Sequence, residues 1–188
     1  MVTWQDFAAE IRRSEGVVSH LYLDTVGKVT VGVGNLLPTV ADAQRLAFVG
    51  RGTLRPATAA EIAADYAAVQ RQPRGLRASA YLAHTSLDLP HAAIDTLLQT
   101  RIEAFRRELG TKFPKFAEYP LTVQFALLDM GFNLGTHGLV SKFPSFTRAV
   151  LAGDWATAAR ESHRPQVQAT RNAVVRGWLQ PTSFGTIP

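Results

Sequence analysis

The chain of 188 residues contains no cysteine. This absence excludes a disulfide scaffold, a thiol nucleophile and a cysteine-ligated zinc or iron–sulfur site. No run approaches the roughly 18 uninterrupted apolar residues of a membrane span, and the segment after Met1 has neither the basic nor the apolar region of a signal peptide. The five histidines show no metal-ligand spacing. We therefore expect no metal, no organic cofactor and no membrane insertion.

The charge balance favours an anionic partner. Twenty Lys and Arg residues against fifteen Asp and Glu residues give a formal net charge of +5. The basic residues are dispersed, and no basic block, zinc-finger spacing or aromatic RNA-binding signature accompanies them. A bacterial cell wall or a membrane surface would suit this charge as well as a nucleic acid does. Nucleic-acid binding is therefore an alternative carried by charge alone, and we do not expect it.

Hydrophobic periodicity predicts a helix and a β-hairpin early in the chain. Apolar residues recur with helical spacing from Trp4, with Thr3 as a suitable N-cap and Gly16 as a natural end. Residues 20–23 and 29–33 form two short alternating segments around a turn. Together they predict a helix followed directly by a β-hairpin.

Helices dominate the rest of the chain. A capping box at Thr58 opens an alanine-rich helix through about Val69, and the strongest helical periodicity runs from Ile94 to Leu109. Shorter helices are expected at 122–132, 145–151, 155–162 and 171–179.

These elements predict one α+β domain over 1–188. We expect a small N-terminal lobe at 1–89 that carries the hairpin and an insertion. A connecting helix and a helical lobe follow at 90–188.

Two carboxylates and a hydroxyl are the candidate catalytic groups. Glu15 is expected at a helix end, Asp24 in the hairpin turn and Thr30 on the returning strand. Because a helix followed by a hairpin folds back, these three can converge. Glycosidic cleavage needs one carboxyl group held protonated and one ionised. Partial burial would favour the protonated form of Glu15, Asp24 would stay ionised in an open turn, and Thr30 could hold a water. A Glu, Asp and Thr at such positions are also common in proteins without catalytic activity.

The segment from Ser14 to Leu37, SEGVVSHLYLDTVGKVTVGVGNLL, resembles the catalytic segment of the phage-type lysozymes, the T-even phage endolysin family. That family's pattern is Glu-Gly, eight residues between the Glu and an Asp, and five more before a Thr in Thr-x-Gly-x-Gly, which Glu15, Asp24 and Thr30 match without a gap. Three downstream segments resemble the family's helical lobe: QFALLDMGFNLG at 124–135, FPS at 143–145 and GDWATAA at 153–159. The resemblance covers roughly 1–40 and 90–180.

The resemblance implies a two-lobed lysozyme-like fold and a muramidase. Such an enzyme cuts the β-1,4 bond between N-acetylmuramic acid and N-acetylglucosamine in peptidoglycan. By family, Glu15 would be the general acid, Asp24 the second carboxylate and Thr30 the residue beside the attacking water, with inversion at the anomeric carbon. The substrate-binding candidates are Gly32, Leu36, Phe132, Asn133, Ser145 and Arg171, with Phe143 as a weaker one.

Physical reasons support some of these binding candidates, and others have an alternative role. A side chain at Gly32 or Gly34 would block a saccharide that lies against the hairpin. For Phe132 and Phe143, core packing is the alternative. An Arg near the end of the family's chain reaches the catalytic Glu, and Arg171 is preferred here over Arg176.

The sequence also departs from the family pattern. Asn35 stands where many members have a His after Gly-x-Gly, which removes a structural ion pair rather than a catalytic group. Residues 41–89 are longer than the minimal enzyme requires and match no known pattern. That insertion could cover the cleft, bind an inhibitor or have no specific role.

The biological setting has two forms. The protein would be a phage endolysin released through a holin, or a bacterial antibacterial effector delivered by a secretion system such as type VI. In both cases it would be made in the cytoplasm without a signal peptide and would act in the periplasm or cell wall. Its partner is the peptidoglycan glycan strand, and an effector would also need an immunity protein. We expect a monomer. The alternative is a non-catalytic wall-glycan-binding module on the same fold.

Overall fold

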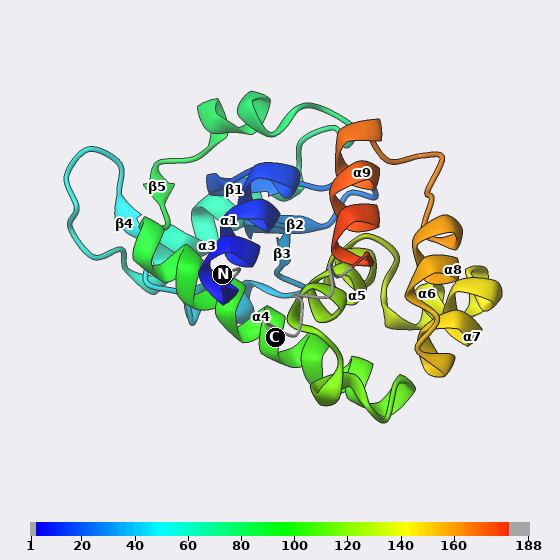
Figure 1. Ribbon diagram of the computed structural model, residues 1–188. Helices are drawn as coiled ribbons and strands as arrows, with labels where there is room; N and C mark the ends of the chain where they lie inside the picture. The colour runs from blue at the N-terminus through cyan, green and yellow to red at the C-terminus, as the bar shows by residue number, and fades with distance from the viewer. Residues whose placement is uncertain (1–2, 181–188) are drawn as a thin grey trace. The chain divides into compact units, whose positions relative to one another are not determined.

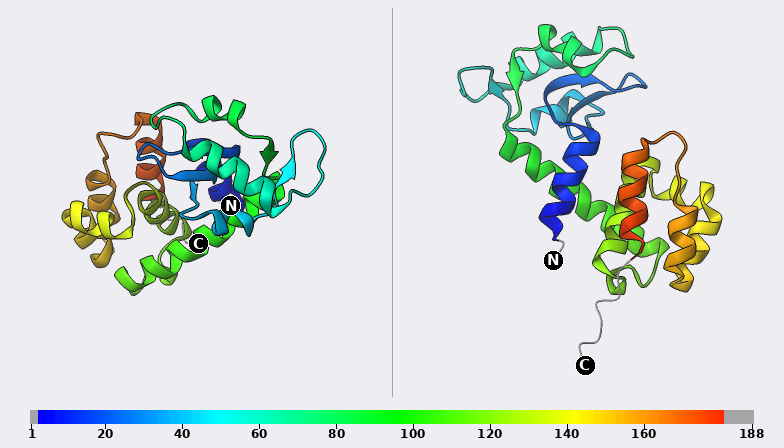
Figure 2. Two further views of the ribbon diagram at one scale, coloured as in Figure 1. Left: turned by 180° about the vertical axis from the view of Figure 1, so that it is seen from behind. Right: turned by 45° about the horizontal axis from the view of Figure 1, so that its top comes forward.

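The computed structural model describes residues 3–180 of the protein (Figure 1). The chain forms two compact units. The sheet unit is Ala8–Thr100, and the helical unit combines Met1–Phe7 with Arg101–Pro188, described only within the range just given. Figure 2 shows the elements of each unit from two further sides. Small antiparallel sheets precede a mainly helical part, which confirms the predicted α+β class.

The first helix, α1 (Trp4–Glu15), begins and ends where the sequence predicts. Its start is capped because Thr3 Oγ1 donates to Asp6 Oδ2 at 2.7 Å and accepts from the Asp6 amide at 3.3 Å. It ends because Gly16 adopts a φ of +78°, the left-handed conformation that terminates helices. Local capping chemistry therefore places Glu15 in the last position of the helix.

A three-stranded antiparallel sheet follows, in the order β1 (Val18–Leu23), β2 (Val29–Gly32) and β3 (Asn35–Leu36). Every residue of the central strand β2 is buried. The sequence predicts only the two-stranded hairpin. Strand β3 escapes the prediction because two residues are too few to show alternation.

The residues of the predicted insertion form short elements that are built onto this sheet. These are α2 (Val40–Gln44), β4 (Val49–Gly50), α3 (Ala59–Gln70), the 3-10 helix η1 (Ala78–His84) and β5 (Leu87–Asp88). Strands β4 and β5 pair with each other, and α3 and η1 both pack against β1. Helix α3 starts with the predicted capping box, in which Thr58 and Glu61 exchange hydrogen bonds.

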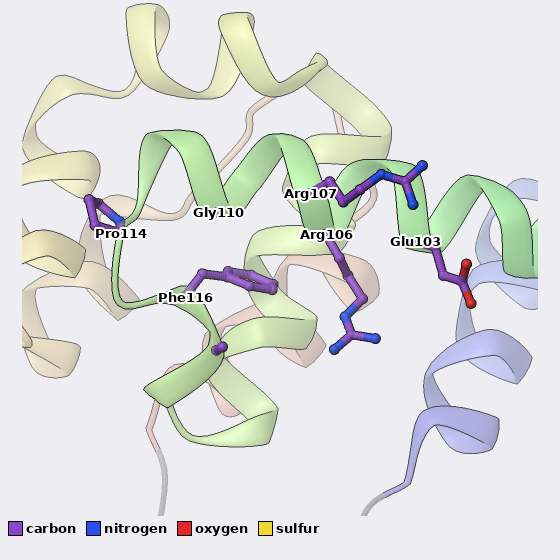
Figure 3. Close-up of a pocket in the computed structure, with 7 residues that line it drawn as sticks. Glu103, Arg106, Arg107, Gly110, Pro114 and Phe116 are labelled. Carbon is purple, nitrogen blue, oxygen red and sulfur yellow. The ribbon is translucent and has the colours of Figure 1, made fainter.

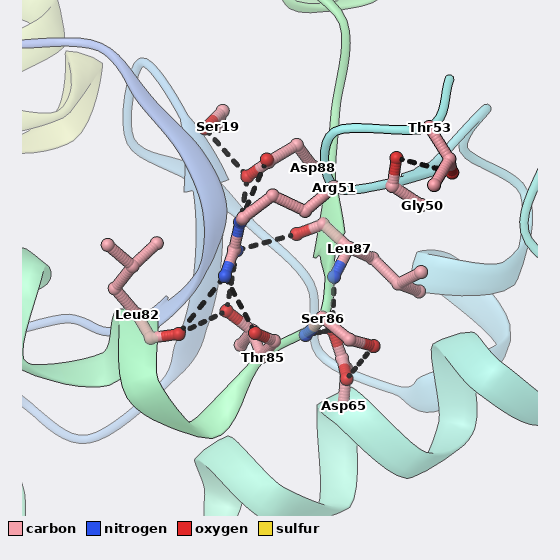
Figure 4. A network of polar contacts seen from close by, with 10 residues as sticks. All are labelled: Ser19, Gly50, Arg51, Thr53, Asp65, Leu82, Thr85, Ser86, Leu87 and Asp88. Atoms are coloured by element: carbon pink, nitrogen blue, oxygen red, sulfur yellow. Dashed lines mark hydrogen bonds and ion pairs between the residues drawn. The ribbon is translucent and has the colours of Figure 1, made fainter. Parts of the chain in front are cut away.

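Arg51, directly after β4, ties the insertion together (Figure 4). Its Nε donates to Asp88 Oδ2 at 2.9 Å, and Asp88 also accepts from Ser19 Oγ of β1 at 2.9 Å. The Arg51 guanidinium donates as well to the carbonyl oxygens of Leu82, Thr85 and Leu87. Burial raises the pKa of Asp88, but the hydrogen bonds from Arg51 and Ser19 and the charge of Arg51 outweigh it and hold that pKa below its usual value. The segment is thus fastened to the sheet.

The long helix α4 (His91–Lys112) contains the boundary between the two units, at Thr100 and Arg101. The sequence places that boundary before the helix, at residue 90, and assigns residues 1–7 to the strand-bearing part. In the structure residues 1–7 group with the helical unit. Predicted and observed bounds of the helix itself agree closely.

The helical unit contains η2 (Phe116–Glu118), α5 (Leu121–Leu134), α6 (Thr136–Lys142), α7 (Pro144–Ala152), α8 (Trp155–Glu161) and α9 (Ala169–Trp178). Four of these correspond to predicted helices, whereas α6 was not predicted from the sequence. Aromatic rings form its core around Phe125, which stacks on Phe7 at 4.9 Å and meets Trp4 edge-on at 4.9 Å and Trp178 at 5.9 Å.

Candidate active site

Glu15 is the last residue of α1, and two residues separate it from the start of β1. Its side chain is exposed. The expectation of partial burial is therefore wrong, because the left-handed Gly16 turns the chain away before an apolar neighbour can cover the helix end.

Asp24 forms the turn between β1 and β2, as the sequence predicts. Its Oδ1 accepts hydrogen bonds from the amides of Val26 at 3.0 Å and Lys28 at 2.7 Å. The Asp24 amide donates to the Lys28 carbonyl oxygen at 2.9 Å, which closes the turn. Within residues 3–180 no hydrogen bond reaches Asp24 Oδ2. One oxygen is fixed by the backbone, and the other remains an acceptor for water.

Thr30 lies opposite Tyr22 of β1 and opposite Leu36 of β3. Directly paired residues of antiparallel strands point to the same face, and residues two apart along a strand share that face. Thr30 and Leu36 therefore share a face of the sheet. Asp24 lies one residue beyond β1, but its amide donates to the Lys28 carbonyl oxygen, which places it opposite Lys28 and on the side of Thr30. We call these three residues the hairpin face.

The Thr30 hydroxyl is already oriented. Its Oγ1 donates to the Lys28 carbonyl oxygen at 3.0 Å, which uses the single hydrogen of the hydroxyl. Two lone pairs remain, so the group can only accept from a further partner. Thr30 is only 3% exposed, so little of this residue faces solvent.

Leu36 and Gly32 were predicted to contact saccharide. Leu36 is 49% exposed at the end of the hairpin face, which suits such a contact. The reason offered for Gly32 is wrong, because a Cβ there would meet Ile94 Cγ2 at 3.3 Å, inside the unit rather than on its surface. Its φ of +68° is a second, conformational reason for glycine. Its role in substrate binding stays a prediction.

The other predicted contacts belong to the helical unit. Phe132 on α5 packs at 4.7 Å from Phe105, and the guanidinium of Arg101 lies 4.8 Å from its ring centroid. This burial agrees with the core alternative. Asn133 is exposed near the end of α5, and Ser145 on α7 accepts from Arg148 at 3.3 Å. Both residues are accessible to a ligand, and their binding roles stay predictions.

Arg171 on α9 is part of a buried ion cluster. Its Nε donates to Asp129 Oδ2 at 2.9 Å, and the guanidinium of Arg164 pairs with Asp129 Oδ1 at 2.8 Å. Asp129 and Arg164 are almost completely buried, and Arg171 is 12% exposed. The predicted action of Arg171 on Glu15 stays a prediction. What the pairs establish is that Asp129 fixes the guanidinium of Arg171 on α9.

The sequence reasoning missed Asp129 and Arg164. A signal for Asp129 was present, because it is the single charge within the apolar run FALLDMGF, and a buried carboxylate requires a cation. Arg164 carries no comparable signal. Arg51 was missed as well, because its carbonyl partners come together only through the fold.

A pocket of about 380 Å³ lies on the helical unit between α4 and the segment that follows it (Figure 3). Glu103, Arg106 and Arg107 line one side, and Phe116 lies opposite. The Arg106 guanidinium also lies 4.4 Å from the ring centroid of Trp4. The pocket combines both charge signs with an aromatic ring and contains none of the predicted catalytic residues.

Residues 3–180 contain no group of three or more His, Asp or Glu side chains that could hold a metal ion. Within the same range no helix combines the length and apolar character needed to cross a bilayer. Comparison of the chain with protein-family models and with curated proteins yields no match. A functional assignment therefore depends on the residue pattern and on the geometry described above.

Proposed function

We propose that this protein is a peptidoglycan hydrolase, an N-acetylmuramidase on a two-lobed lysozyme-like fold. The observation that carries the proposal is the hairpin face. Asp24 has one oxygen fixed by two backbone amides, and the acceptor-only Thr30 lies on the same side of the sheet. The resemblance of residues 14–37 to the phage-type lysozymes agrees with this arrangement.

The proposed reaction is hydrolysis with inversion. Glu15 gives its proton to the glycosidic oxygen as the bond to the anomeric carbon breaks. A water held by Thr30 and Asp24 attacks that carbon from the opposite face and passes a proton to Asp24. The sugar gains a hydroxyl group, and the leaving saccharide keeps the proton from Glu15. Proton transfer back through solvent restores both carboxyl groups.

The exposure of Glu15 has a direct bearing on this role. Burial is what favours the protonated form of the acid in glycosidases of this kind. A saccharide bound over the end of α1 would itself exclude water from the Glu15 carboxyl group. The same exposure favours the alternative function, a wall-glycan-binding module that does not cleave.

The test is hydrolysis of purified peptidoglycan by the wild type, Glu15→Gln and Asp24→Asn, with mass analysis of the products. We expect each variant to lose about 10²–10⁴-fold in kcat, the usual contribution of a general acid or base. NMR of the first product should show inverted anomeric configuration. Glu10→Gln is the control from the same helix α1, where the Glu10 side chain, 11% exposed, pairs with Arg13 and accepts from Ser14 Oγ.

The outcomes separate the candidates. Muropeptides that end in reducing N-acetylmuramic acid, lost in both variants but kept in Glu10→Gln, are the expected result. Undiminished cleavage by Glu15→Gln removes that residue from the mechanism. Wild-type binding to peptidoglycan without any cleavage would leave the non-catalytic module as the function.

A further inference from the structure

The predicted insertion brings a basic loop to the turn that carries Asp24. We call residues 71–77, RQPRGLR, the arginine loop. It connects α3 to η1, and both of these elements pack against β1. The loop is held in place because Tyr81, which is fully buried, donates from its hydroxyl to the Pro73 carbonyl oxygen at 2.8 Å. The His20 Nε2 of β1 also lies 2.9 Å from the Ala78 carbonyl oxygen.

The loop touches the hairpin turn directly. A Cβ added to Gly27 would lie 3.5 Å from both Cβ and Cδ of Arg74. The aliphatic stem of Arg74 therefore lies against the turn at Gly27. Gly27 has a φ of +84°, so the turn itself demands glycine, and that glycine leaves space for the arginine stem.

The charge of the arginine loop is not neutralised locally. Arg71, Arg74 and Arg77 are all exposed, and within residues 3–180 none of the three forms an ion pair. No Asp or Glu occurs anywhere in 66–87. The two acidic residues that flank this range, Asp65 and Asp88, are already engaged by Ser86 and Arg51. An exposed Lys28 adds a fourth positive charge from the turn.

We propose that the arginine loop is a subsite for anionic groups, carboxylate or phosphate, carried by the polymer whose glycan chain is cut at the hairpin face. This inference rests on the proposed function and deepens it. Guanidinium groups bind carboxylates and phosphates through paired hydrogen bonds. Arg74 lies against the turn that carries Asp24, and Arg71 and Arg77 flank it in the same loop, so the loop would select glycan strands that carry such groups over neutral strands.

The experiment compares two triple variants of equal charge change. Arg71→Gln, Arg74→Gln and Arg77→Gln remove the charge of the arginine loop, and Lys112→Gln, Lys115→Gln and Arg160→Gln remove three exposed charges from the helical unit. Circular dichroism checks that both fold. Binding to peptidoglycan is measured by co-sedimentation, and KM and kcat by release of reducing ends, at ionic strengths from about 0.01 to 0.15 M.

Three forms of peptidoglycan distinguish the sources of negative charge. One keeps its carboxylates and its phosphate-bearing wall polymers, one has lost the phosphate polymers, and one has its carboxylates converted to amides. For the charged forms we expect the arginine-loop variant to bind about tenfold more weakly at low salt, with raised KM and unchanged kcat. The control variant should keep wild-type affinity. A variant with Lys in place of all three arginines should recover part of the binding.

Each outcome bears on one proposal at a time. The subsite is overturned if the two triple variants bind every form of peptidoglycan equally well, whether or not both bind more weakly than the wild type. An equal loss in both would point to an effect of the total surface charge. A selective loss with only the phosphate-bearing or only the carboxylate-bearing form names the group that binds. If the wild type cleaves none of the three forms, the proposed function is contradicted. The co-sedimentation measurement still tests the subsite in that case, because it does not depend on cleavage. Selective capture of an acidic protein, with no loss of binding to peptidoglycan, overturns the subsite in favour of a protein partner.

Discussion

The helical unit and the sheet unit each depend on an arginine–carboxylate pair, in very different surroundings. In the helical unit, Asp129 and Arg164 are 1% and 0% exposed, so this ion pair is almost completely shielded from water. In the sheet unit, Arg51 and Asp88 are 33% and 26% exposed, and the guanidinium also donates to three backbone carbonyl oxygens. A buried pair that loses one partner leaves a bare charge away from water. When the half-exposed Arg51 network loses its arginine, the carbonyl oxygens that it leaves can still bind water.

The largest effect on stability is expected from Asp129→Asn. This change removes the carboxylate between Arg164 and Arg171 and leaves both guanidinium groups in their buried positions. We expect the free energy of unfolding to fall by about 3–5 kcal/mol, the usual result of breaking a buried ion pair. Tryptophan fluorescence during urea unfolding measures it, because all three tryptophans, Trp4, Trp155 and Trp178, belong to the helical unit.

The control for this change is Asp95→Asn. Asp95 pairs with Arg12 at 2.6 Å, but the two side chains are 49% and 33% exposed. We expect a loss of about 1 kcal/mol or less for this exposed pair. Similar losses for Asp129→Asn and Asp95→Asn would mean that burial does not set the cost, and the contrast between the two units would fail.

Arg51→Met comes next in size. The substitution keeps an unbranched apolar side chain and removes the hydrogen bonds to Asp88 and to the carbonyl oxygens of η1 and β5. We expect a loss of about 1–3 kcal/mol, because several acceptors lose a charged donor but remain near solvent. Amide hydrogen exchange locates the effect. The amides of residue 51 and Leu89, which donate to Ser86 and Ser19, should exchange faster.

Arg45→Met is the matched control for that experiment. Among residues 3–180 Arg45 pairs only with Asp42, three positions earlier in the chain, and its side chain is 77% exposed. We expect no measurable change in exchange at the amides of residue 51 and Leu89. Protection that is retained in Arg51→Met would show that β4 and β5 hold together without the arginine.

The parts of the fold that the sequence predicted are those decided by neighbouring residues. Thr3 and Gly16 bound α1, and Thr58 with Glu61 opens α3, because capping depends on a few adjacent positions. The hairpin with Asp24 in its turn was likewise predicted, since strand alternation is a local rule.

What the sequence could not predict depends on distant partners. The covering of Gly27 by Arg74 joins residues far apart in the chain, and the Arg51 network needs η1 and β5 already in place. The exposure of Glu15 is a third case. Apolar neighbours in sequence suggested burial, but the final position of a helix before a left-handed glycine has no further turn to cover it.

The smallest effect on stability is expected from the exposed ion pair of Glu61 with Arg55. Hydrogen bonds from Arg55 and Thr58 lower the pKa of Glu61 to about 2, although the carboxyl group is at the surface. A carboxyl group whose pKa falls on folding adds stability that is complete above its unfolded pKa and is lost as the pH falls through the folded value. Wild-type protein should therefore exceed Glu61→Gln in stability above a pH of about 4.5, and this advantage should vanish as the pH approaches 2.

Urea unfolding of both proteins between these pH values, followed by tyrosine near-ultraviolet circular dichroism, measures the advantage in the sheet unit, which contains Tyr22, Tyr66 and Tyr81. Glu161→Gln is the control, because within residues 3–180 no ion pair holds Glu161. If the difference in free energy of unfolding between wild type and Glu61→Gln does not change with pH, the capping box stabilises the protein through hydrogen bonding alone, without a contribution from the charge of Glu61. The expected result is a stability difference between wild type and Glu61→Gln that disappears in acid and is smaller than the loss in Arg51→Met. The stability losses would then decrease with the burial of the ion pair, from Asp129 through Arg51 to Glu61.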